Sequence, residues 1–331
     1  MKSTRRFFLK SSPPVLGLVL ALLQPQGAIA QAQNYPNKTI TIISPIPAGG
    51  STDKLVRQVA LQLQKRLGQP VVVENKPGGA SSIGTAYVAK AAPDGYTLVL
   101  VNASHVINPH VFSSLPFDAL KDFAPVVQMV NVQMGLFVNP AMPAKNMAEF
   151  LALAKARPET INYGTAGTGG VGHMTGEMFN QSAGLAIQHI PYRGSAPALI
   201  DLLSGQVQSV IVDAPGGQPY VKSGQLRALA IASKTRSASL PDVPTFSEAG
   251  VKNMETAIWV GLLAPAKTPP DIVRLLNREI VAALREPAMA ADIRAQGFEL
   301  VAGTPEEFGK AIRDDYATFG AIVKSAKIKI D

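Results

Sequence analysis

Residues 39–53 read TITIISPIPAGGSTD, an apolar β-rich run that passes through a proline–glycine loop directly into an amphipathic helix. Gly49 and Gly50 have no Cβ, so a ligand can approach the backbone closely. The N–H groups that open a helix have no partners within it, and they attract anions such as a carboxylate. A second loop of this kind, YGTAGTGGVGH at 163–173, predicts a site built from two backbone loops rather than from reactive side chains.

The first thirty residues have the pattern of an export signal. Residues 4–10, TRRFFLK, fit a twin-arginine motif, residues 15–23 form a short apolar segment, and AIA at 28–30 fits a cleavage site. The apolar run is well short of the roughly 20 residues that a membrane span needs. We therefore expect a signal peptide over 1–30, cleavage before Gln31 and a periplasmic location.

The composition argues against several classes of protein. The chain has 31 Lys and Arg, 23 Asp and Glu and no Cys; four of the basic residues lie in the expected signal, which leaves 27 basic and 23 acidic residues, a net charge of +4. These charges are scattered, without the basic blocks typical of nucleic-acid binding. The four histidines lack metal-ligand spacing. We expect a monomer without a metal, a cofactor or a nucleic-acid partner.

Strand-like and helix-like stretches alternate along the chain, which indicates an α/β fold of two lobes, each a mostly parallel sheet flanked by helices. Strands are predicted at 40–43, 71–74, 96–101, 160–163, 187–190, 208–212 and 226–232. Helices are predicted at 54–67, 81–91, 148–156, 173–182, 196–203, 271–285, 288–296 and 305–324.

Two β-rich stretches, 126–138 and 256–263, have the pattern of crossings between the lobes. If both cross, lobe 1 comprises residues 33–130 and 254–331, and lobe 2 comprises residues 131–253. The two glycine loops then lie on opposite lips of a cleft between the lobes, at the carboxyl ends of strands, where α/β proteins bind ligands. Trp259 in the second crossing is predicted to pack at the hinge.

Enzyme and nucleotide motifs are incomplete. Residues 167–172 match G-x-G-x-x-G, but a dinucleotide site also needs an acidic residue about 20 positions on, and residues 188–193, QHIPYR, contain none. Tight-turn packing and small-anion binding remain open for this loop. Residues 79–83, GASSI, fail the last position of the G-x-S-x-G serine-hydrolase motif.

Two acidic side chains have alternative roles. Asp213 follows an apolar strand, so it faces the cleft, where it either holds a ligand ammonium or hydroxyl group or caps the backbone from Gly216 onward. Asp53 is predicted to cap a helix that starts at Lys54, because a carboxylate would repel an anionic solute.

Two cationic or basic side chains are also ambiguous. Arg193 either pairs with a ligand carboxylate or forms a salt bridge near the hinge. His105, which follows Ser104 in a strand-end loop, is either a base or a packing residue.

The order of the motifs resembles the solute-binding receptors of tripartite tricarboxylate transporters, the Bug-type receptors. The resemblance covers essentially the whole mature chain. It rests on PIPAGGSTD at 45–53, ENKPGG at 74–79, PDGYTL at 93–98, NYGTAG at 162–167, HIPYRGSAPA at 189–198, DLLSGQV at 201–207, DVPT at 242–245, EAG at 248–250 and GLLAP at 261–265. Ile46 departs from the bulky or aromatic residue usual in the first loop.

The resemblance implies a two-lobed periplasmic binding fold of type II and a small organic carboxylate held by the loops 46–52 and 165–171, largely through main-chain N–H groups and water. It also implies delivery to a permease of one large and one small membrane subunit. The expected contacts to the carboxylate are Pro47, Ala48, Gly49, Gly50, Ser51, Thr165, Ala166, Gly167, Thr168, Gly169 and Gly170. For the distal end of the ligand they are Ser104, His105, Tyr192 and Asp213. The alternatives are a ligand-loaded sensor for a signalling receptor and a periplasmic enzyme acting on an organic acid; we expect no catalytic residue.

Overall fold

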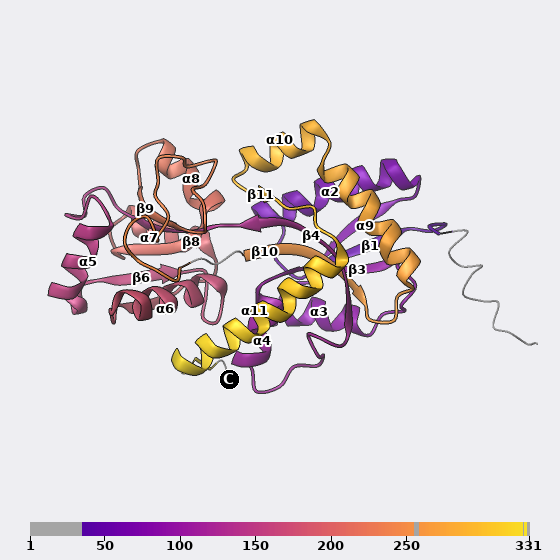
Figure 1. Cartoon of the computed structure of the whole chain (residues 1–331), viewed down its shortest axis with the longest axis horizontal. Helices are drawn as coiled ribbons and strands as arrows, with labels where there is room; N and C mark the ends of the chain where they lie inside the picture. The colour runs from indigo at the N-terminus through magenta and orange to yellow at the C-terminus, as the bar shows by residue number, and fades with distance from the viewer. Residues whose placement is uncertain (1–34, 255–257, 327, 330–331) are drawn as a thin grey trace, which may run out of the picture. The chain divides into compact units, whose positions relative to one another are not determined.

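The computed structural model describes residues 35–254, 258–326 and 328–329 (Figure 1). The predicted export signal at 1–30 lies outside these residues. The described chain forms two sheets, each flanked by helices. None of the described helices combines the length and the apolarity that crossing a membrane requires.

The first sheet has six strands in the order β11-β4-β10-β3-β1-β2. We call this sheet and its helices lobe 1. Its strands are β1 (Ile40–Ser44), β2 (Val71–Asn75), β3 (Thr97–Asn102), β4 (Phe123–Val132), β10 (Ile258–Pro265) and β11 (Glu299–Leu300). Its helices are α2 (Ser51–Leu67), α3 (Ser82–Ala89), α4 (Ser104–Val111), α9 (Pro270–Leu284), α10 (Pro287–Ala295) and α11 (Pro305–Ala326), with a short 3₁₀ turn at Gly79–Ser81.

The second sheet has five strands in the order β7-β6-β8-β5-β9 and, with its helices, is called lobe 2. Its strands are β5 (Met134–Val138), β6 (Asn162–Thr165), β7 (Gln188–Pro191), β8 (Ser209–Asp213) and β9 (Arg227–Ala232). Its helices are α5 (Met147–Ala156), α6 (Val171–Ala183), α7 (Ser195–Leu203) and α8 (Ala214–Lys222), with a 3₁₀ turn at Pro158–Thr160.

Both sheets are mixed, so the prediction of mostly parallel sheets is wrong, although the α/β class with two sheets is confirmed. In lobe 1, β1 pairs in parallel with β2 and β3, whereas β10 runs antiparallel to β3 and β4, and β11 antiparallel to β4. In lobe 2, β6 is parallel to β7 and β8, and β5 is antiparallel to β8 and β9. The physical reason is connectivity: β4 leaves lobe 1 while β10 returns to it, so the two strands run in opposite directions.

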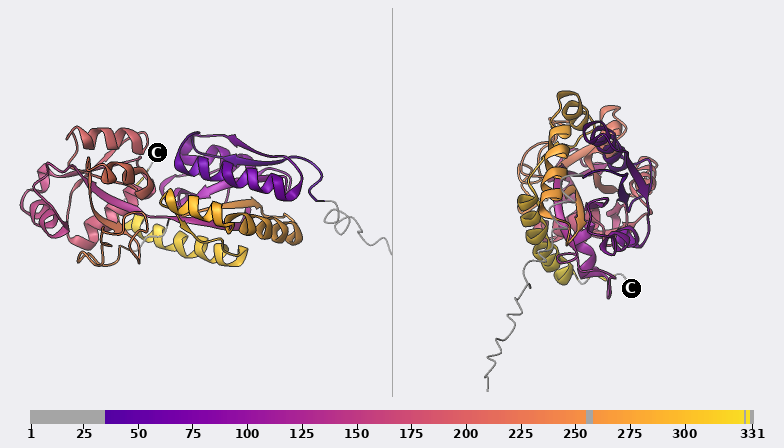
Figure 2. Two further views of the ribbon diagram at one scale, coloured as in Figure 1. Left: turned by 90° about the horizontal axis from the view of Figure 1, so that it is seen from above. Right: turned by 90° about the vertical axis from the view of Figure 1, so that its right-hand side faces the viewer.

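The β4–β5 segment carries the chain between the two lobes, with Gln133 as the single residue between the strands. Figure 1 shows it joining the two groups of elements, and Figure 2 shows the same junction from above. The helix α11 is a further connection, because it packs on α4 and β4 and also contacts α6. At that contact Gln181 Nε2 donates to Ser325 Oγ at 2.9 Å.

Trp259 anchors β10 to α11 within lobe 1. Its ring packs edge-on against Phe308 with the ring centroids 5.1 Å apart, and its Nε1–H donates to Asp315 Oδ2 at 2.7 Å. The residue is almost completely buried. It therefore fixes the strand that returns from lobe 2 to the C-terminal helix, and its packing partners belong to lobe 1.

Two helices begin two or three residues earlier than predicted, and both lie beside the glycine loops. The helix α2 starts at Ser51 rather than Lys54, and α6 starts at Val171 rather than His173. In each case the residue at the N-cap is a glycine, Gly50 or Gly170, with extended backbone angles. The side chains of Ser51, Thr52 and Asp53 misled the prediction, because they favour caps but here lie inside the first turn.

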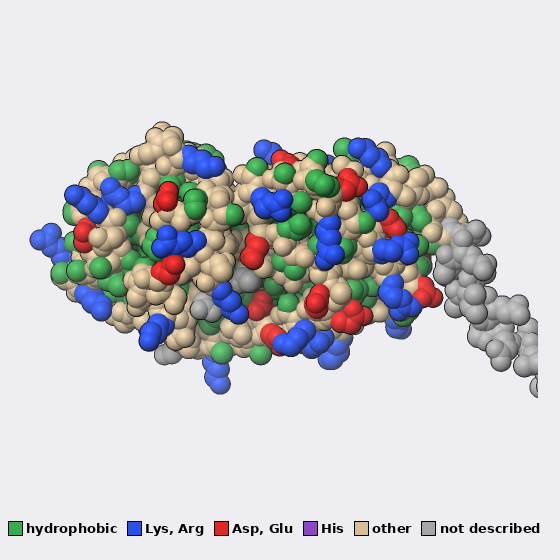
Figure 3. Space-filling view, turned by 45° about the horizontal axis from the view of Figure 1, so that its top comes forward, with side chains coloured by type: hydrophobic (Ala, Val, Ile, Leu, Met, Phe, Trp, Pro, Cys, Tyr) green, Lys and Arg blue, Asp and Glu red, His purple; other side chains and the backbone are tan. Residues whose placement is uncertain are grey.

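The charged side chains are spread over the surface in the way that the sequence indicates. Figure 3 shows one face of the molecule, on which Lys and Arg side chains are dispersed over both lobes and interspersed with Asp and Glu. On this face they do not merge into one continuous basic stripe of the kind that tracks a nucleic-acid backbone.

Candidate ligand-binding cleft

A cavity of about 460 Å³ lies between elements of the two lobes. Three classes of residue line it: loop and helix-start residues, polar residues at strand ends, and an apolar band from the crossing strands. The lining residues are Ile46, Pro47, Ser51, Thr52, Ala80, Ser81, Asn102, Ser104, Asn108, Val132, Met134, Ala166, Gly167, Thr168, Gly169, Gly170, Val171, Gly172, Ser195, Val212, Asp213, Ile258 and Val260.

Two helix N-termini, those of α2 and α6, meet at this cavity from opposite lobes. A glycine N-cap has no side-chain oxygen, so neither Gly50 nor Gly170 can satisfy the first N–H groups of its helix. The first intrahelical bonds are donated by Lys54 to Gly50 and by Met174 to Gly170, both at 3.0 Å. Among the described residues, no acceptor pairs with the N–H groups of 51–53 or 171–173. These two sets of donors and the positive ends of the two helix dipoles suit an anion.

The first glycine loop is fixed by Asp53, which is only 2% exposed. Its Oδ2 accepts from Gly49 N–H at 3.0 Å and from Arg57 Nε at 2.9 Å, and its Oδ1 accepts from Asn75 Nδ2 at 2.8 Å. Burial opposes ionisation, but the bonds from Arg57, Asn75 and Gly49 hold the pKa of Asp53 below its usual range. The predicted capping role is therefore wrong: Asp53 closes the loop, and it occupies the Gly49 N–H that was expected to bind a ligand.

The second glycine loop is closed in a comparable way by His173. Gly169 N–H donates to His173 Nδ1 at 3.0 Å, so both loops use a side chain four residues further on. The His173 ring stacks on His189 with the centroids 3.9 Å apart. Burial lowers the pKa of His173, and burial together with the neighbouring His173 lowers the pKa of His189 to about 3. A neutral His173 can accept the Gly169 bond, so neither imidazole supplies charge to an anion.

The glycines of the G-x-G-x-x-G stretch have separate roles. Gly167 and Gly169 have φ values of +149° and +72°, which other residues rarely adopt. Gly172 allows close packing, because a Cβ there would lie 2.7 Å from the Ile211 carbonyl oxygen of β8. The start of α6 therefore rests directly on the sheet, which supports the packing alternative for Gly172, while Gly167, Gly169 and Gly170 line the cavity.

Asp213 has the capping role that was one of its two predicted alternatives. Its Oδ1 accepts from Gly216 N–H at 2.8 Å, and its Oδ2 accepts from Ser195 Oγ at 3.3 Å. Burial raises the pKa of Asp213, because the bonds from Gly216 and Ser195 only partly offset desolvation. The side chain also lines the cavity beside Ser195, so the two roles are compatible.

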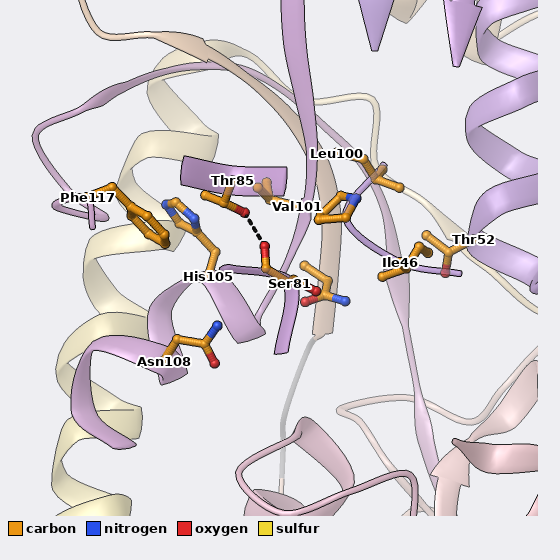
Figure 4. A pocket seen from close by; sticks show the side chains of 11 residues that line it. Ile46, Thr52, Ser81, Thr85, Leu100, Val101, His105, Asn108 and Phe117 are labelled. Carbon is orange, nitrogen blue, oxygen red and sulfur yellow. Dashed lines mark hydrogen bonds between the residues drawn. The ribbon is translucent and has the colours of Figure 1, made fainter. Parts of the chain in front are cut away.

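His105 does not line the cleft but a small neighbouring cavity of about 10 Å³. Figure 4 shows its ring beside Phe117. Its Nε2–H donates to the Ala119 carbonyl at 2.9 Å, and its ring also packs against Phe123. Burial lowers the pKa of His105 to about 4. These contacts favour the packing role, and the neutral ring rules out an electrostatic grip on an anion near pH 7.

The structure brings together most of the predicted site residues but not all of them. Those that line the cleft are Pro47, Ser51, Ser104, Ala166, Gly167, Thr168, Gly169, Gly170 and Asp213. Those outside its lining are Ala48, Gly49, Gly50, Thr165, His105 and Tyr192. Tyr192 instead donates its hydroxyl to Asp201 Oδ2 at 2.7 Å. Arg193 is exposed and, among the described residues, makes no ion pair.

The sequence analysis missed several residues of the cleft. Asn102 ends β3, and its side chain accepts from Ser104 N–H at 2.9 Å, so a strand end placed one residue later would have identified it. Ala80 and Ser81 line the cleft with φ values of +49° and +77°. Their neighbours Gly78 and Gly79 also have positive φ, so this glycine pair is the sequence signal that marks the turn.

The polar groups of the cleft indicate the kind of ligand that it suits. Within the described ranges, no three His, Asp or Glu side chains are grouped so that they could hold a metal ion. The polar groups of the cleft are backbone N–H groups, hydroxyls, amides and a single carboxylate, Asp213. This donor set suits an organic anion with an aliphatic body, since Val132, Met134 and Val260 form an apolar wall.

Comparison with known proteins agrees with this description. The sequence matches the profile of the tripartite tricarboxylate transporter family receptor over residues 55–328. Protein BugT of Bordetella pertussis is 37% identical over 318 residues, which cover 96% of this chain and 97% of BugT.

Two solved structures share the fold. One, described as a periplasmic transporter, is 42% identical and has a TM-score of 0.82. The match covers 90% of this chain and 100% of that structure's chain. The other, R. palustris Rpa4515 with adipate, is 33% identical and also has a TM-score of 0.82. The match covers 89% of this chain and 99% of that structure's chain. These similarities confirm the expected periplasmic binding protein fold.

Proposed function

Because the chain belongs to the family of tripartite tricarboxylate transporter receptors, we propose that it captures a small organic carboxylate in the cleft and delivers it to a membrane permease of one large and one small subunit. The family consists of solute-binding receptors and not of enzymes. Its relative Rpa4515 was solved with adipate. An aliphatic acid is therefore the first class of ligand to consider.

One observation carries this proposal: two glycine-capped helix N-termini from different lobes line the same cavity. Each presents three N–H groups that no described acceptor uses. A carboxylate has two oxygens and about four lone-pair sites, so it can accept from both helices at once. Binding in that way connects the lobes without any charged side chain from the protein.

The remainder of the ligand is proposed to lie along the apolar band formed by Val132, Met134, Val212, Ile258 and Val260. The cavity is much larger than a small acid, so closure of the lobes accompanies binding, as in other two-lobed receptors. Ser104, Asp213 and Ser195 lie on the cavity wall and are proposed to contact the distal end of the ligand.

We propose the cellular setting from the sequence. Export through the twin-arginine pattern at residues 4–10 and cleavage near Ala30 would give a monomeric periplasmic protein. We also propose that the lobes divide at 33–130 plus 254–331 and at 131–253, with the hinge at the crossings.

Ligand-dependent stabilisation tests the function. Purified mature protein is screened by thermal unfolding against adipate and other mono-, di- and tricarboxylates. A ligand at 100 times its Kd should add about 2.7 kcal/mol to the free energy of unfolding. Amides of the same acids serve as controls, because they lack the carboxylate, and should give no shift. Stabilisation by the amides, or turnover of any acid at catalytic amounts of protein, would contradict the proposal.

A further inference from the structure

A second cavity, of about 290 Å³, lies at the junction of the lobes, away from the cleft. We call it the rear cavity. Its lining comes from the crossing residue Gln133, from the loop after β9 in lobe 2 and from the end of α10 with β11 in lobe 1. The lining residues are Gln133, Thr235, Arg236, Ser237, Ala238, Ser239, Arg294, Gly297, Phe298, Glu299 and Leu300.

The rear cavity and the cleft lie on opposite sides of the crossing strand. Val132 and Met134 line the cleft, whereas Gln133 between them lines the rear cavity. This agrees with the alternation of side chains along an extended strand. The neighbouring strands divide in the same way, because β8 and β10 border the cleft, whereas β11 and the loop after β9 border the rear cavity.

The floor of the rear cavity offers polar groups in a buried setting. Gln133 is 6% exposed, and within the described chain its side-chain amide makes no hydrogen bond, although it lines the cavity. Ser237 is also buried, and its hydroxyl lies 3.0 Å from the Ser239 hydroxyl. The amide opens onto the cavity rather than being sealed in the protein, so a bound group can reach it. A bound acceptor would satisfy it together with these hydroxyls.

The rim of the rear cavity carries one arginine from each lobe. Arg236 belongs to lobe 2 and is held by Glu248 Oε2, which lies 2.8 Å from its Nε. Arg294 is at the end of α10 in lobe 1 and, within the part of the chain that the structure describes, makes no ion pair. The one acidic residue of the lining is Glu299. Two guanidinium groups above amide and hydroxyl donors suit an oxyanion.

The lobes also approach each other closely at this margin. A Cβ on Gly297 of lobe 1 would lie 3.1 Å from Ser239 Oγ and 3.3 Å from Pro215 Cγ, both in lobe 2. Any change in the angle between the lobes therefore changes the rear cavity. An ion held by both arginines contacts both lobes, and its binding is linked to their separation.

We propose that the rear cavity is a second binding site, which takes a small oxyanion between Arg236 and Arg294 with Gln133 and Ser237 as donors on its floor. This site is distinct from the carboxylate cleft. It gives the receptor an ion-sensitive contact between the lobes on the far side of the crossing strand.

Binding of inorganic phosphate tests this site directly. Thermal unfolding of the mature protein is followed against phosphate, with sodium chloride at matched ionic strength as the baseline. The wild type should gain a saturable phosphate-specific stabilisation. Arg294→Gln and Arg236→Gln should each weaken the apparent phosphate affinity at least fivefold, and Ser237→Ala should weaken it in the same direction. Sulfate and acetate, titrated in parallel, distinguish a preference for tetrahedral oxyanions from one for carboxylates.

Two matched variants distinguish binding in the rear cavity from a general effect of arginine removal and from binding in the cleft. Arg274→Gln removes an exposed arginine of α9 outside the rear cavity, and it should keep the full phosphate response. Gly170→Asp alters the cleft, and it should also keep the response. No phosphate-specific stabilisation of the wild type would overturn the proposal. So would a response that Gly170→Asp abolishes and Arg294→Gln retains, because the ion would then lie in the cleft; the carboxylate function would be unaffected.

Discussion

Replacing Gly170 by aspartate should abolish carboxylate binding while leaving the protein folded. Gly170 caps α6 with φ −78° and ψ 171°, which any residue can adopt, and the nearest atom to a new Cβ is 3.5 Å away. An aspartate at an N-cap accepts from the N–H groups of the second and third helical residues, here 172 and 173. It would occupy the donors that the ligand needs and repel the ligand as a like charge.

We expect Gly170→Asp to lower affinity at least 100-fold, about 2.7 kcal/mol, while the melting temperature stays equal or rises slightly. Calorimetric titration with the acid that stabilises the protein most in the screen measures the affinity, and thermal unfolding measures the melting temperature. Gly170→Ala is the matched control. It adds the Cβ but no oxygen, so its carboxylate affinity should fall less than tenfold. Equal affinity in the aspartate variant and the wild type would show that the N-terminus of α6 does not bind the ligand.

Replacing Gly172 by valine should damage both stability and binding. A Cβ at this position would lie 2.7 Å from the Ile211 carbonyl oxygen and 3.3 Å from Met134 Cε. Because a backbone oxygen cannot move away as a side chain can, the start of α6 must shift off the sheet. We expect a loss of about 3 kcal/mol in the free energy of unfolding and at least a tenfold loss of affinity, since the shift displaces the N–H groups of 171–173.

The control for Gly172→Val is Gly50→Ala on α2. A Cβ at Gly50 would meet no atom within 4 Å, so the free energy of unfolding should change by less than about 1 kcal/mol. Urea unfolding of both variants and the wild type provides the comparison. If Gly172→Val unfolds at the same urea concentration as the wild type, the close packing of α6 on β8 does not hold this loop in place.

Local patterns were sufficient to predict the strands and helices on either side of the two glycine loops, but not α4, because Ser104 and His105 were expected in a loop. Alternation of apolar runs with glycine loops predicted β1, α2, β6 and α6, because a strand followed by a glycine turn and a helix is encoded within about twenty consecutive residues. The same patterns predicted that the two glycine loops lie on opposite lips of one cleft, because carboxyl ends of strands meet ligands in α/β folds. These patterns did not predict the apolar wall that the crossing strands form, because that wall depends on which face of each strand meets the cleft.

Long-range contacts could not be predicted from the sequence, and they account for the remaining differences. Asp53 looked like a cap, but its partners include Asn75, which lies 22 residues away in β2. His105 was open between a base and a packing residue, and only its burial against Phe117, Phe123 and the Ala119 carbonyl decides for packing. The antiparallel strands of each sheet follow from the direction in which the chain crosses between lobes, which no local pattern reports.

The most direct test of the central claim is an amide NMR titration, because the claim assigns the carboxylate to six particular N–H groups. The mature protein, labelled with ¹⁵N, is titrated with the acid that stabilises it most. The account predicts that the largest downfield shifts fall among the amide protons of residues 51–53 and 171–173, with at least one from each helix, because the bound carboxylate accepts from donors in both sets. If these six signals stay in place while amides elsewhere respond to saturation, the ligand is not held by the two helix N-termini and the account is wrong.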